Sequence, residues 1–211
     1  FDKVDLWHEI ATLLLKKHLE AFYKFKQKSW ENEHIQLQIL EEKDENFNEE
    51  YIIKYDKEKE ELRIALENIK STIEKGDFKD FTFRHLKNIG FEHHLYQPLL
   101  ALDENSSYLE IKPIALNEGE RIFVQDLKKF FEKSEEFFEE KELYLLRNRS
   151  LGKGIGFFDV DRYYPDFILW LVIGKKQNIA FLDPKGIQIL GINDPKVNFY
   201  SSIKDLESQF N

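Results

Sequence analysis

The chain has 211 residues, of which 42% are hydrophobic and 34% are charged, and its formal net charge is −9. This length suffices for one domain with a substantial core, or for a domain with an appended arm. The absence of cysteine excludes disulfides and thiolate metal sites and fits a reducing compartment, so we expect a cytoplasmic protein.

The distribution of apolar and charged residues narrows the class of partner. No run of about 18 apolar residues occurs, so no membrane span is predicted. The average charge of −9 argues against a nucleic-acid partner, but the charge is uneven. Between Lys141 and Lys185, eight Lys or Arg residues stand against five Asp or Glu residues, an excess of +3. This local excess permits contact with DNA without requiring it.

The first part of the chain predicts a long helix and strand candidates. From Val4 to about Trp30, apolar side chains recur at steps of three and four residues, which is typical of an amphipathic helix. Residues His34 to Leu40 alternate in polarity with a period of two, as in a strand. After a charged loop, Tyr51 to Tyr55 is a second strand candidate.

A charged helix is predicted from Lys57 to about Lys75, where Gly76 is a stop signal. The signals from Phe78 to Ile89 are mixed, and we predict a further helix there. Residues 1–90 are therefore expected to be a helical N-terminal segment with a short β-hairpin.

Two strands and the best-marked helix follow. Leu99 to Leu102 and Tyr108 to Ile114 are predicted to pair around a polar turn. Asn117 begins the helix, because this N-cap residue has Glu120 three positions later, which is the spacing of a capping box. The apolar stripe of this helix continues to residue 138.

The last part of the chain predicts three strands and a final helix. Leu143 to Arg147 is the first strand, and the apolar runs Tyr164 to Trp170 and Ile179 to Gly186 are the next two, after a glycine-rich loop from Leu151 to Gly156. Because these two runs are apolar on both faces, we expect helices on both sides of the sheet. A final helix from Asp194 gives the order helix, three strands, helix, and an α/β fold class.

The second and third of these strands bring two acids together. If they form a hairpin centred on Gly174-Lys175, the numbers of paired positions sum to 349 and Asp166 lies opposite Asp183. Lys185 shares the face of the aspartates, because side chains alternate along a strand. Like charges opposed at about 5 Å destabilise a sheet, and a cation between them offsets the repulsion. Two carboxylates with a lysine two residues further on are the groups of a metal-dependent phosphodiesterase.

These residues resemble the motif of a known superfamily. Pro165-Asp166, then sixteen residues, then Asp183-Pro184-Lys185 is similar to the motif of the PD-(D/E)XK nucleases, whose restriction-endonuclease-like core has a helix, three strands and a helix around a mixed sheet. More narrowly, residues 94–190 resemble the C-terminal region of type III restriction-enzyme-like DEAD/DEAH-box helicases. The matching segments are His94–Leu100, Leu116–Arg121, Tyr144–Asn148, Gly152–Phe158, Tyr164–Phe167 and Asp183–Gly186.

The resemblance implies a domain organisation. Residues 91–211 are expected to be the nuclease core, with its closing strand beyond Asn211, so that the core is cut short at its C-terminal end. The chain begins at Phe1 without an initiator methionine or a signal-peptide pattern, and we expect a fragment of a longer parent. Because the sequence has no helicase phosphate-binding loop, the helicase region is expected upstream.

The resemblance also implies roles for site residues. Asp166 and Asp183 would hold one or two Mg²⁺ ions, with Mn²⁺ as a substitute, and the main-chain carbonyl of Pro184 would be a further ligand. Lys185 would orient the attacking water or stabilise the transition state at phosphorus. A third acid is expected on the first core helix, where Glu120 is the candidate and Glu118 its substitute.

Arg147, Arg149 and Lys153 are candidates for contacts with DNA phosphates. For the two arginines the alternative is a structural ion pair, and for the loop that carries Lys153 it is a plain flexible connector. The two aspartates have the alternative of strand-end acids that bind no metal. For Glu120 the alternative is a capping role alone.

Three functional hypotheses follow. The first is a Mg²⁺-dependent DNA endonuclease domain, the cutting module of a helicase-nuclease used in restriction or phage defence, with DNA, the helicase region of the parent and a specificity subunit as partners. The second is a catalytically inactive PD-(D/E)XK-like fold that binds DNA or docks on the helicase. The third is a helical interaction module, in which the N-terminal half wraps a partner.

Overall fold

The computed structural model describes residues 2–34, 39–41, 43–48, 50–55, 60–83, 85–102, 109–149, 154–156, 163–184, 203–204 and 207. The chain divides into two compact units. The first unit contains residues 1–41, 156–163 and 190–211, and the second contains residues 42–155 and 164–189.

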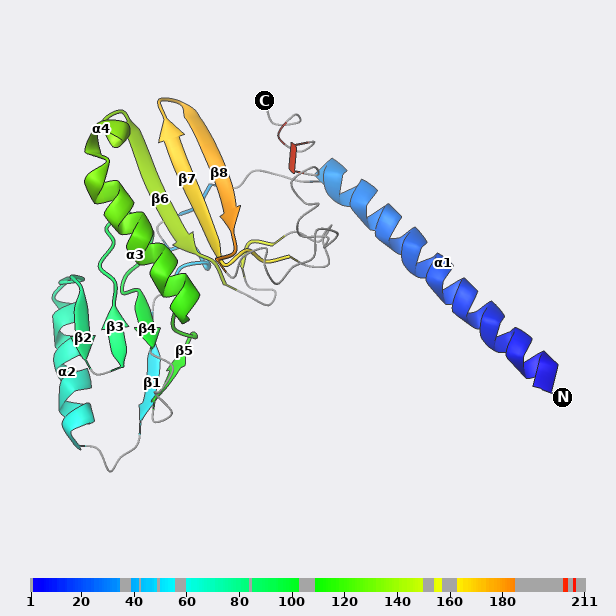
Figure 1. Ribbon diagram of the computed structural model, residues 1–211, viewed down its shortest axis with the longest axis horizontal. Helices are drawn as coiled ribbons and strands as arrows, with labels where there is room; N and C mark the ends of the chain where they lie inside the picture. The colour runs from blue at the N-terminus through cyan, green and yellow to red at the C-terminus, as the bar shows by residue number, and fades with distance from the viewer. Residues whose placement is uncertain are drawn as a thin grey trace. The chain divides into compact units, whose positions relative to one another are not determined.

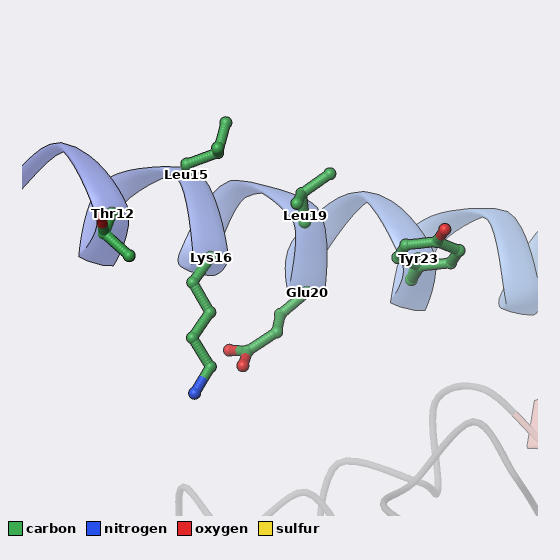
Figure 2. A pocket seen from close by; sticks show the side chains of 6 residues that line it. All are labelled: Thr12, Leu15, Lys16, Leu19, Glu20 and Tyr23. Carbon is green, nitrogen blue, oxygen red and sulfur yellow. The ribbon is translucent and has the colours of Figure 1, made fainter.

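The first unit contains one long helix, α1 (Asp2–His34, 33 residues), which is drawn in blue in Figure 1. It confirms the helix predicted from Val4 to Trp30 and leaves many of its large apolar side chains exposed. Figure 2 shows the six side chains of α1 that line a pocket, which belong to Thr12, Leu15, Lys16, Leu19, Glu20 and Tyr23. Every lining residue belongs to this helix, so the described residues provide no second wall.

The strand predicted from His34 to Leu40 is not a described element. His34 belongs to α1, and residues 35–38 lie outside the described residues. The final helix predicted from Asp194 also lies outside them, apart from Ile203, Lys204 and Glu207. Among the helices that the structure describes, none combines the length and apolar character that a membrane crossing requires.

The second unit begins with small antiparallel sheets and a helix. Strand β1 pairs with β5, and β2, β3 and β4 form a sheet in that order. The bounds are β1 (Ile52–Tyr55), α2 (Glu60–Glu74), β2 (Phe81–Phe83), β3 (Leu86–Asn88), β4 (Leu100–Leu102) and β5 (Leu109–Lys112). Helix α2 agrees with the predicted charged helix, and Gly76 after it has φ +75°, a backbone conformation that glycine adopts without a steric penalty. The side chain of Leu62 on α2 packs in one core with residues of these strands.

The helix predicted from Phe78 to Ile89 is wrong, because β2 and β3 form an antiparallel hairpin there. Its apolar pattern has period two rather than 3.6: Phe81 and Phe83 pack against the core while Thr82 between them is exposed. The buried side chain of Asn88 adds contacts distant in sequence. It donates to the carbonyls of Phe78 and Lys79, both at 3.0 Å, and accepts from the Leu99 amide at 3.0 Å.

The predicted pairing of residues 99–102 with 108–114 is also wrong. Strand β4 pairs with β3 instead, and β5 pairs with β1. Both residues of the pair Leu100–Asn88 are buried, whereas β1 and β5 alternate in exposure, as shown by the opposed residues Ile53 and Ile111. The strands therefore pair according to which side chains they bury, and not with the strand nearest in sequence. The pairing of β3 with β4 also crosses the predicted domain boundary at residue 90.

The main sheet follows, in the order β6 (Lys141–Arg147), β7 (Phe167–Ile173) and β8 (Lys176–Leu182), all antiparallel. Helix α3 (Glu118–Lys133) packs against one face of it (Figure 1), and the short helix α4 (Glu135–Phe138) follows α3. The predicted capping box is confirmed at the start of α3, but Ser134 separates α3 from α4 where one continuous helix to residue 138 was predicted.

The core between α3 and the main sheet is made of residues from both. The helix contributes Phe123, Val124, Leu127 and Phe131, and the sheet contributes Leu143, Leu145, Phe167, Leu169, Leu171 and Leu182. At the outer edge of β6, His94 forms a parallel bridge to Leu145. The described fold is thus a mixed α/β arrangement of helices and small antiparallel sheets. The restriction-endonuclease-like core stays a prediction.

Candidate active site at one end of the main sheet

The hairpin of β7 and β8 has the predicted register. Ile173 pairs with Lys176 beside the turn and Phe167 pairs with Leu182 at the other end, so that paired numbers sum to 349. Gly174 has φ +59°, which favours glycine in this tight turn. Asp166 directly precedes β7 and Asp183 directly follows β8, so the two aspartates stand at matched positions beyond the last pair.

The two aspartates belong to the face of the sheet opposite α3. Phe167 and Leu182 pack in the core under α3, whereas Ile168 and Phe181 belong to a second cluster. Because successive side chains alternate, Asp166 and Asp183 follow the face of Ile168 and Phe181. Both aspartates are half-buried, and the Oδ2 atom of Asp166 is buried. Opposed positions of an antiparallel pair lie about 5 Å apart at Cβ, which is close enough for one cation to bridge two carboxylates.

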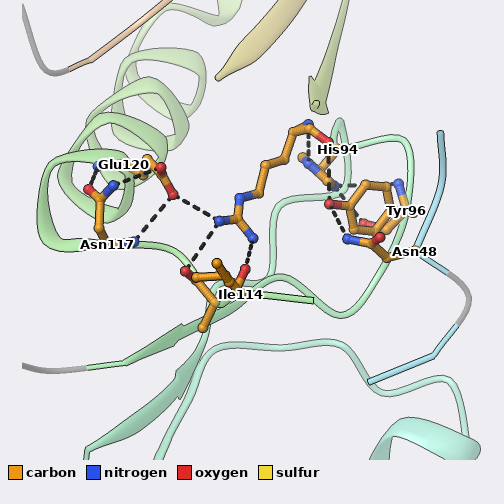
Figure 3. Close-up of polar contacts among 8 residues, drawn as sticks. Asn48, His94, Tyr96, Ile114, Asn117 and Glu120 are labelled. Atoms are coloured by element: carbon orange, nitrogen blue, oxygen red, sulfur yellow. Dashed lines mark hydrogen bonds and ion pairs between the residues drawn. The ribbon is translucent and has the colours of Figure 1, made fainter. Parts of the chain in front are cut away.

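Glu120 lies at the same end of the sheet but on the side of α3. Its Oε2 accepts from the Asn117 amide at 3.2 Å and its Oε1 from Asn117 Nδ2 at 2.7 Å, while its own amide donates to Asn117 Oδ1 at 2.9 Å. Oε2 also accepts from Arg147 Nη2 at 3.0 Å (Figure 3). The capping role of Glu120 is thus confirmed, and its carboxylate already has three donors. The substitute acid, Glu118, is exposed and lies 3.7 Å from Arg121.

Arg147 is paired within the protein. Besides Glu120, its guanidinium donates through Nη1 to the carbonyl of Ile114 and through Nη2 to that of Ala115 at 3.2 Å. Arg147 lies on the last position of β6, opposite Phe167. The residue therefore joins the segment before α3 to the end of the main sheet, which matches the structural ion pair considered as its alternative role.

His94 accepts a hydrogen bond from the main chain of Arg147. The Arg147 amide donates to His94 Nε2 at 2.9 Å, so the proton of the neutral ring is on Nδ1, which donates to the Tyr96 carbonyl at 2.6 Å. Burial is the main cause that lowers the pKa of His94 to about 4, and the charge of Arg147 lowers it further, while the bond to Tyr96 raises it. His94 is therefore neutral at neutral pH. The adjacent pair His93-His94 did not signal this role in the sequence.

Arg149 is also bound to protein groups. Its Nε donates to Asn48 Oδ1 at 3.1 Å and its Nη2 to the Phe47 carbonyl at 2.7 Å. Asn48 in turn donates to the Tyr96 hydroxyl at 2.9 Å, and burial raises the pKa of that hydroxyl. Arg149 therefore holds the segment before β1 on the main sheet, and contact with a phosphate would compete with these bonds.

Asn148 is a residue that sequence reasoning missed. Its amide donates to the Asp166 carbonyl at 2.9 Å, which continues the ladder of β6 and β7 by one residue. Its side chain bonds the Ile155 backbone and the Pro165 carbonyl. An asparagine between a strand and a glycine-rich loop was the available signal, because its side chain readily bonds nearby backbone.

The described residues include only part of the predicted site. Lys185 and Lys153 lie outside them, so their placement stays a prediction. Pro184 is described and half-buried. Within the described ranges, no group of three or more His, Asp or Glu side chains is arranged to hold a metal ion. Asp166 and Asp183 are both described, at matched positions of the hairpin.

Comparison of the chain with protein-family models, with curated proteins and with solved structures finds no match. The resemblance to PD-(D/E)XK nucleases therefore rests on the residue pattern described above. The structure adds the register of β7 and β8 and the contacts around Arg147 and Asn148.

Proposed function

We propose that the chain is a Mg²⁺-dependent DNA endonuclease domain with Asp166 and Asp183 as its metal ligands. The supporting observation is the register of β7 and β8, in which Phe167 faces Leu182 and the two aspartates follow at matched positions. Like charges at directly opposed positions of a sheet repel each other. A divalent cation removes that repulsion and uses the oxygen ligands that it prefers.

In this proposal, the protein's own residues position the reactants. Asp166 and Asp183 hold the cation, with the Pro184 carbonyl as a further ligand and Mn²⁺ as a substitute for Mg²⁺. When bound, the cation supplies positive charge beside the scissile phosphate and makes a water more acidic. Lys185 orients that water or stabilises the charge that develops on the phosphate oxygens.

Glu120 has two competing roles in the proposal. As a third metal ligand it would use a carboxylate whose Oε2 already contacts Arg147 in a buried ion pair 3.0 Å long. As a capping and ion-pair residue it keeps every contact that it makes now. The contacts favour the second role, in which Glu120 acts by holding Arg147 and the end of β6 in place.

The proposed biological setting comes from the resemblance alone. It is a cutting module that works with the helicase region of a longer parent, and with a specificity subunit, in restriction or phage defence. DNA is the proposed substrate. Because Arg147 and Arg149 are bound to protein groups, the proposal gives the phosphate contacts to Lys153 and Lys185.

The test is cleavage of supercoiled plasmid DNA by the purified chain. We expect nicking or cutting with Mg²⁺ or Mn²⁺, no cutting with EDTA, and loss of cutting in Asp166→Ala and Lys185→Ala with unchanged circular dichroism. Asp126→Ala is the matched control, because this aspartate is exposed on α3 and pairs only with the neighbouring Lys129 among the contacts of the described residues. Cutting that survives both Asp166→Ala and Lys185→Ala overturns the proposal.

A second candidate function is an inactive module that binds DNA or docks on the helicase. The net charge of −9 and the internal pairing of both arginines favour docking over DNA binding. Salt-dependent DNA binding in EDTA, without cutting in any divalent metal, would support the DNA-binding form of this candidate.

A further inference from the structure

Asn148 makes four hydrogen bonds just after the end of β6. Its main-chain amide donates to the Asp166 carbonyl at 2.9 Å, and its Nδ2 donates to the carbonyls of Pro165 at 2.9 Å and Ile155 at 2.7 Å. Its Oδ1 accepts from the Ile155 amide at 2.9 Å. The side-chain amide thus has both of its donor hydrogens and its oxygen in use.

These bonds fix the backbone on both sides of one α-carbon. The Pro165 carbonyl belongs to the peptide plane that precedes the Asp166 α-carbon, and the Asp166 carbonyl belongs to the plane that follows it. Because peptide groups are planar, holding both planes leaves the two backbone dihedrals of Asp166 little freedom. The direction of its Cα–Cβ bond, from which the carboxylate extends, is then fixed as well.

Gly154 makes the two hydrogen bonds between Asn148 and Ile155 possible. A Cβ atom at this position would collide with the Arg149 carbonyl and lie 2.5 Å from Asn148 Oδ1. Only glycine lets the turn approach closely enough for Ile155 to bond Asn148 through both its amide and its carbonyl. The described end of the glycine-rich loop is therefore tied, through one side chain, to the segment that leads into β7.

We propose that Asn148 is the positioning residue of the candidate site, which holds the Asp166 carboxylate opposite Asp183 so that the pair can bind a divalent cation. This inference rests on the proposed function, because it assigns Asn148 to the same metal pair. Residues that orient metal ligands without touching the metal typically change metal affinity by about 10- to 100-fold when replaced.

The test is Mn²⁺ binding to the full chain, measured by electron paramagnetic resonance well below the unfolding temperature. We expect the Mn²⁺ dissociation constant of Asn148→Ala to rise about tenfold or more. Asn178→Ala is the matched control, because this exposed asparagine on β8 donates to the Leu171 carbonyl at 3.3 Å, near the turn end of the hairpin. Its Mn²⁺ affinity should equal that of the wild type.

A second measurement uses the unmodified protein, in case Asn148→Ala fails to fold. Coupling between two sites is reciprocal, so Mg²⁺ bound at the aspartates should slow hydrogen exchange of the Ile155 amide. The Ile89 amide, which donates to the Leu99 carbonyl at 3.0 Å, is the control and should not respond.

The possible outcomes distinguish failure of the proposed role of Asn148 from failure of the proposed function. A wild-type chain that binds no Mn²⁺ and cuts no DNA overturns the proposed function, and the inference with it. A wild-type chain that binds Mn²⁺, together with a folded Asn148→Ala of equal affinity, overturns the inference alone. The inference also fails if Mg²⁺ binds without any change in exchange of the Ile155 amide.

Discussion

Arg147 Nη2 lies 3.0 Å from Glu120 Oε2, and these side chains are only 13% and 8% exposed. The pair connects the first turn of α3 to the last residue of β6, at the end of the sheet where Asp166 and Asp183 follow. Two residues expected at an active site, one as a metal ligand and one as a phosphate contact, are thus bound to each other. The opposite charges of the two side chains therefore stabilise the contact between α3 and β6.

Removing the cation of this pair should be costly. We expect Arg147→Leu to lower the free energy of unfolding by about 3–5 kcal/mol, because Glu120 is then a buried charge without its partner. Urea denaturation followed by circular dichroism measures the loss. Arg63→Leu is the control, since this arginine pairs with Glu60 and Glu67 on the exposed side of α2, where solvent screens ion pairs and the loss should be much smaller. Equal losses in the two variants would contradict the argument.

Replacing the anion separates the two roles of Glu120. In Glu120→Gln the side chain keeps its shape and can still form a capping box, but the charge opposite Arg147 is lost. We expect a loss of stability of about 1–3 kcal/mol with unchanged Mn²⁺ affinity, because the carboxylate contacts Asn117 and Arg147. Glu118→Gln, in the same turn but exposed, should change neither quantity. A large loss of Mn²⁺ affinity in Glu120→Gln would instead make Glu120 the third acid.

His94 should make stability depend on pH in the mildly acidic range. Its pKa is lowered to about 4 in the folded state, mainly by burial, against an ordinary value of 6.5. Between these two values the unfolded chain binds the proton and the folded chain does not, so stability falls as the pH drops from about 6.5 to about 4. The full effect is up to about 3 kcal/mol.

The measurement is the free energy of unfolding at several pH values between 4 and 7 (about the range in which an ordinary histidine titrates). His94→Gln should flatten the curve relative to the wild type, because its side chain does not titrate while its amide oxygen can still accept from the Arg147 amide. The matched control is His18→Gln, which replaces an exposed histidine of α1. Parallel curves for the wild type and His94→Gln would show that this histidine is not the source.

The parts of the fold that the sequence predicted are those in which local signals agree. Helix α3 begins at Glu118, directly after its N-cap Asn117, because the capping box is complete within four residues. The β7–β8 hairpin follows from two apolar runs with Gly174 between them, and its register follows from the position of that turn. The matched positions of Asp166 and Asp183 could therefore be derived by counting.

The rest depends on contacts between residues far apart in the chain. Arg147 donates to carbonyls of Ile114 and Ala115, and Arg149 to that of Phe47, and backbone acceptors of this kind leave no mark in a sequence. The hairpin at residues 81–88 was missed because its strands have three residues each, too few to separate a period of two from one of 3.6. Strands of three residues and side-chain contacts to distant backbone carbonyls therefore cannot be predicted from the sequence pattern.

The register at the candidate site can be tested directly by cross-linking, because the chain has no native cysteine. In Asp166→Cys/Asp183→Cys the two new side chains should lie opposite each other on one face of the hairpin. Opposed Cβ atoms are about 4.5–5.5 Å apart, so a small adjustment brings the sulfurs to bonding distance. We expect an intramolecular disulfide after mild oxidation, seen as a mass loss of about two hydrogens and a mobility shift on a non-reducing gel.

The control for this cross-link is Asp166→Cys/Leu182→Cys. Leu182 packs in the core under α3, whereas Asp166 follows the opposite face, so the two thiols should point away from each other and remain reduced. Cross-linking of the control but not of the first pair would mean that the strands are shifted by one residue beyond Phe167. Such a shift would separate the two carboxylates and remove the basis for a shared metal ion.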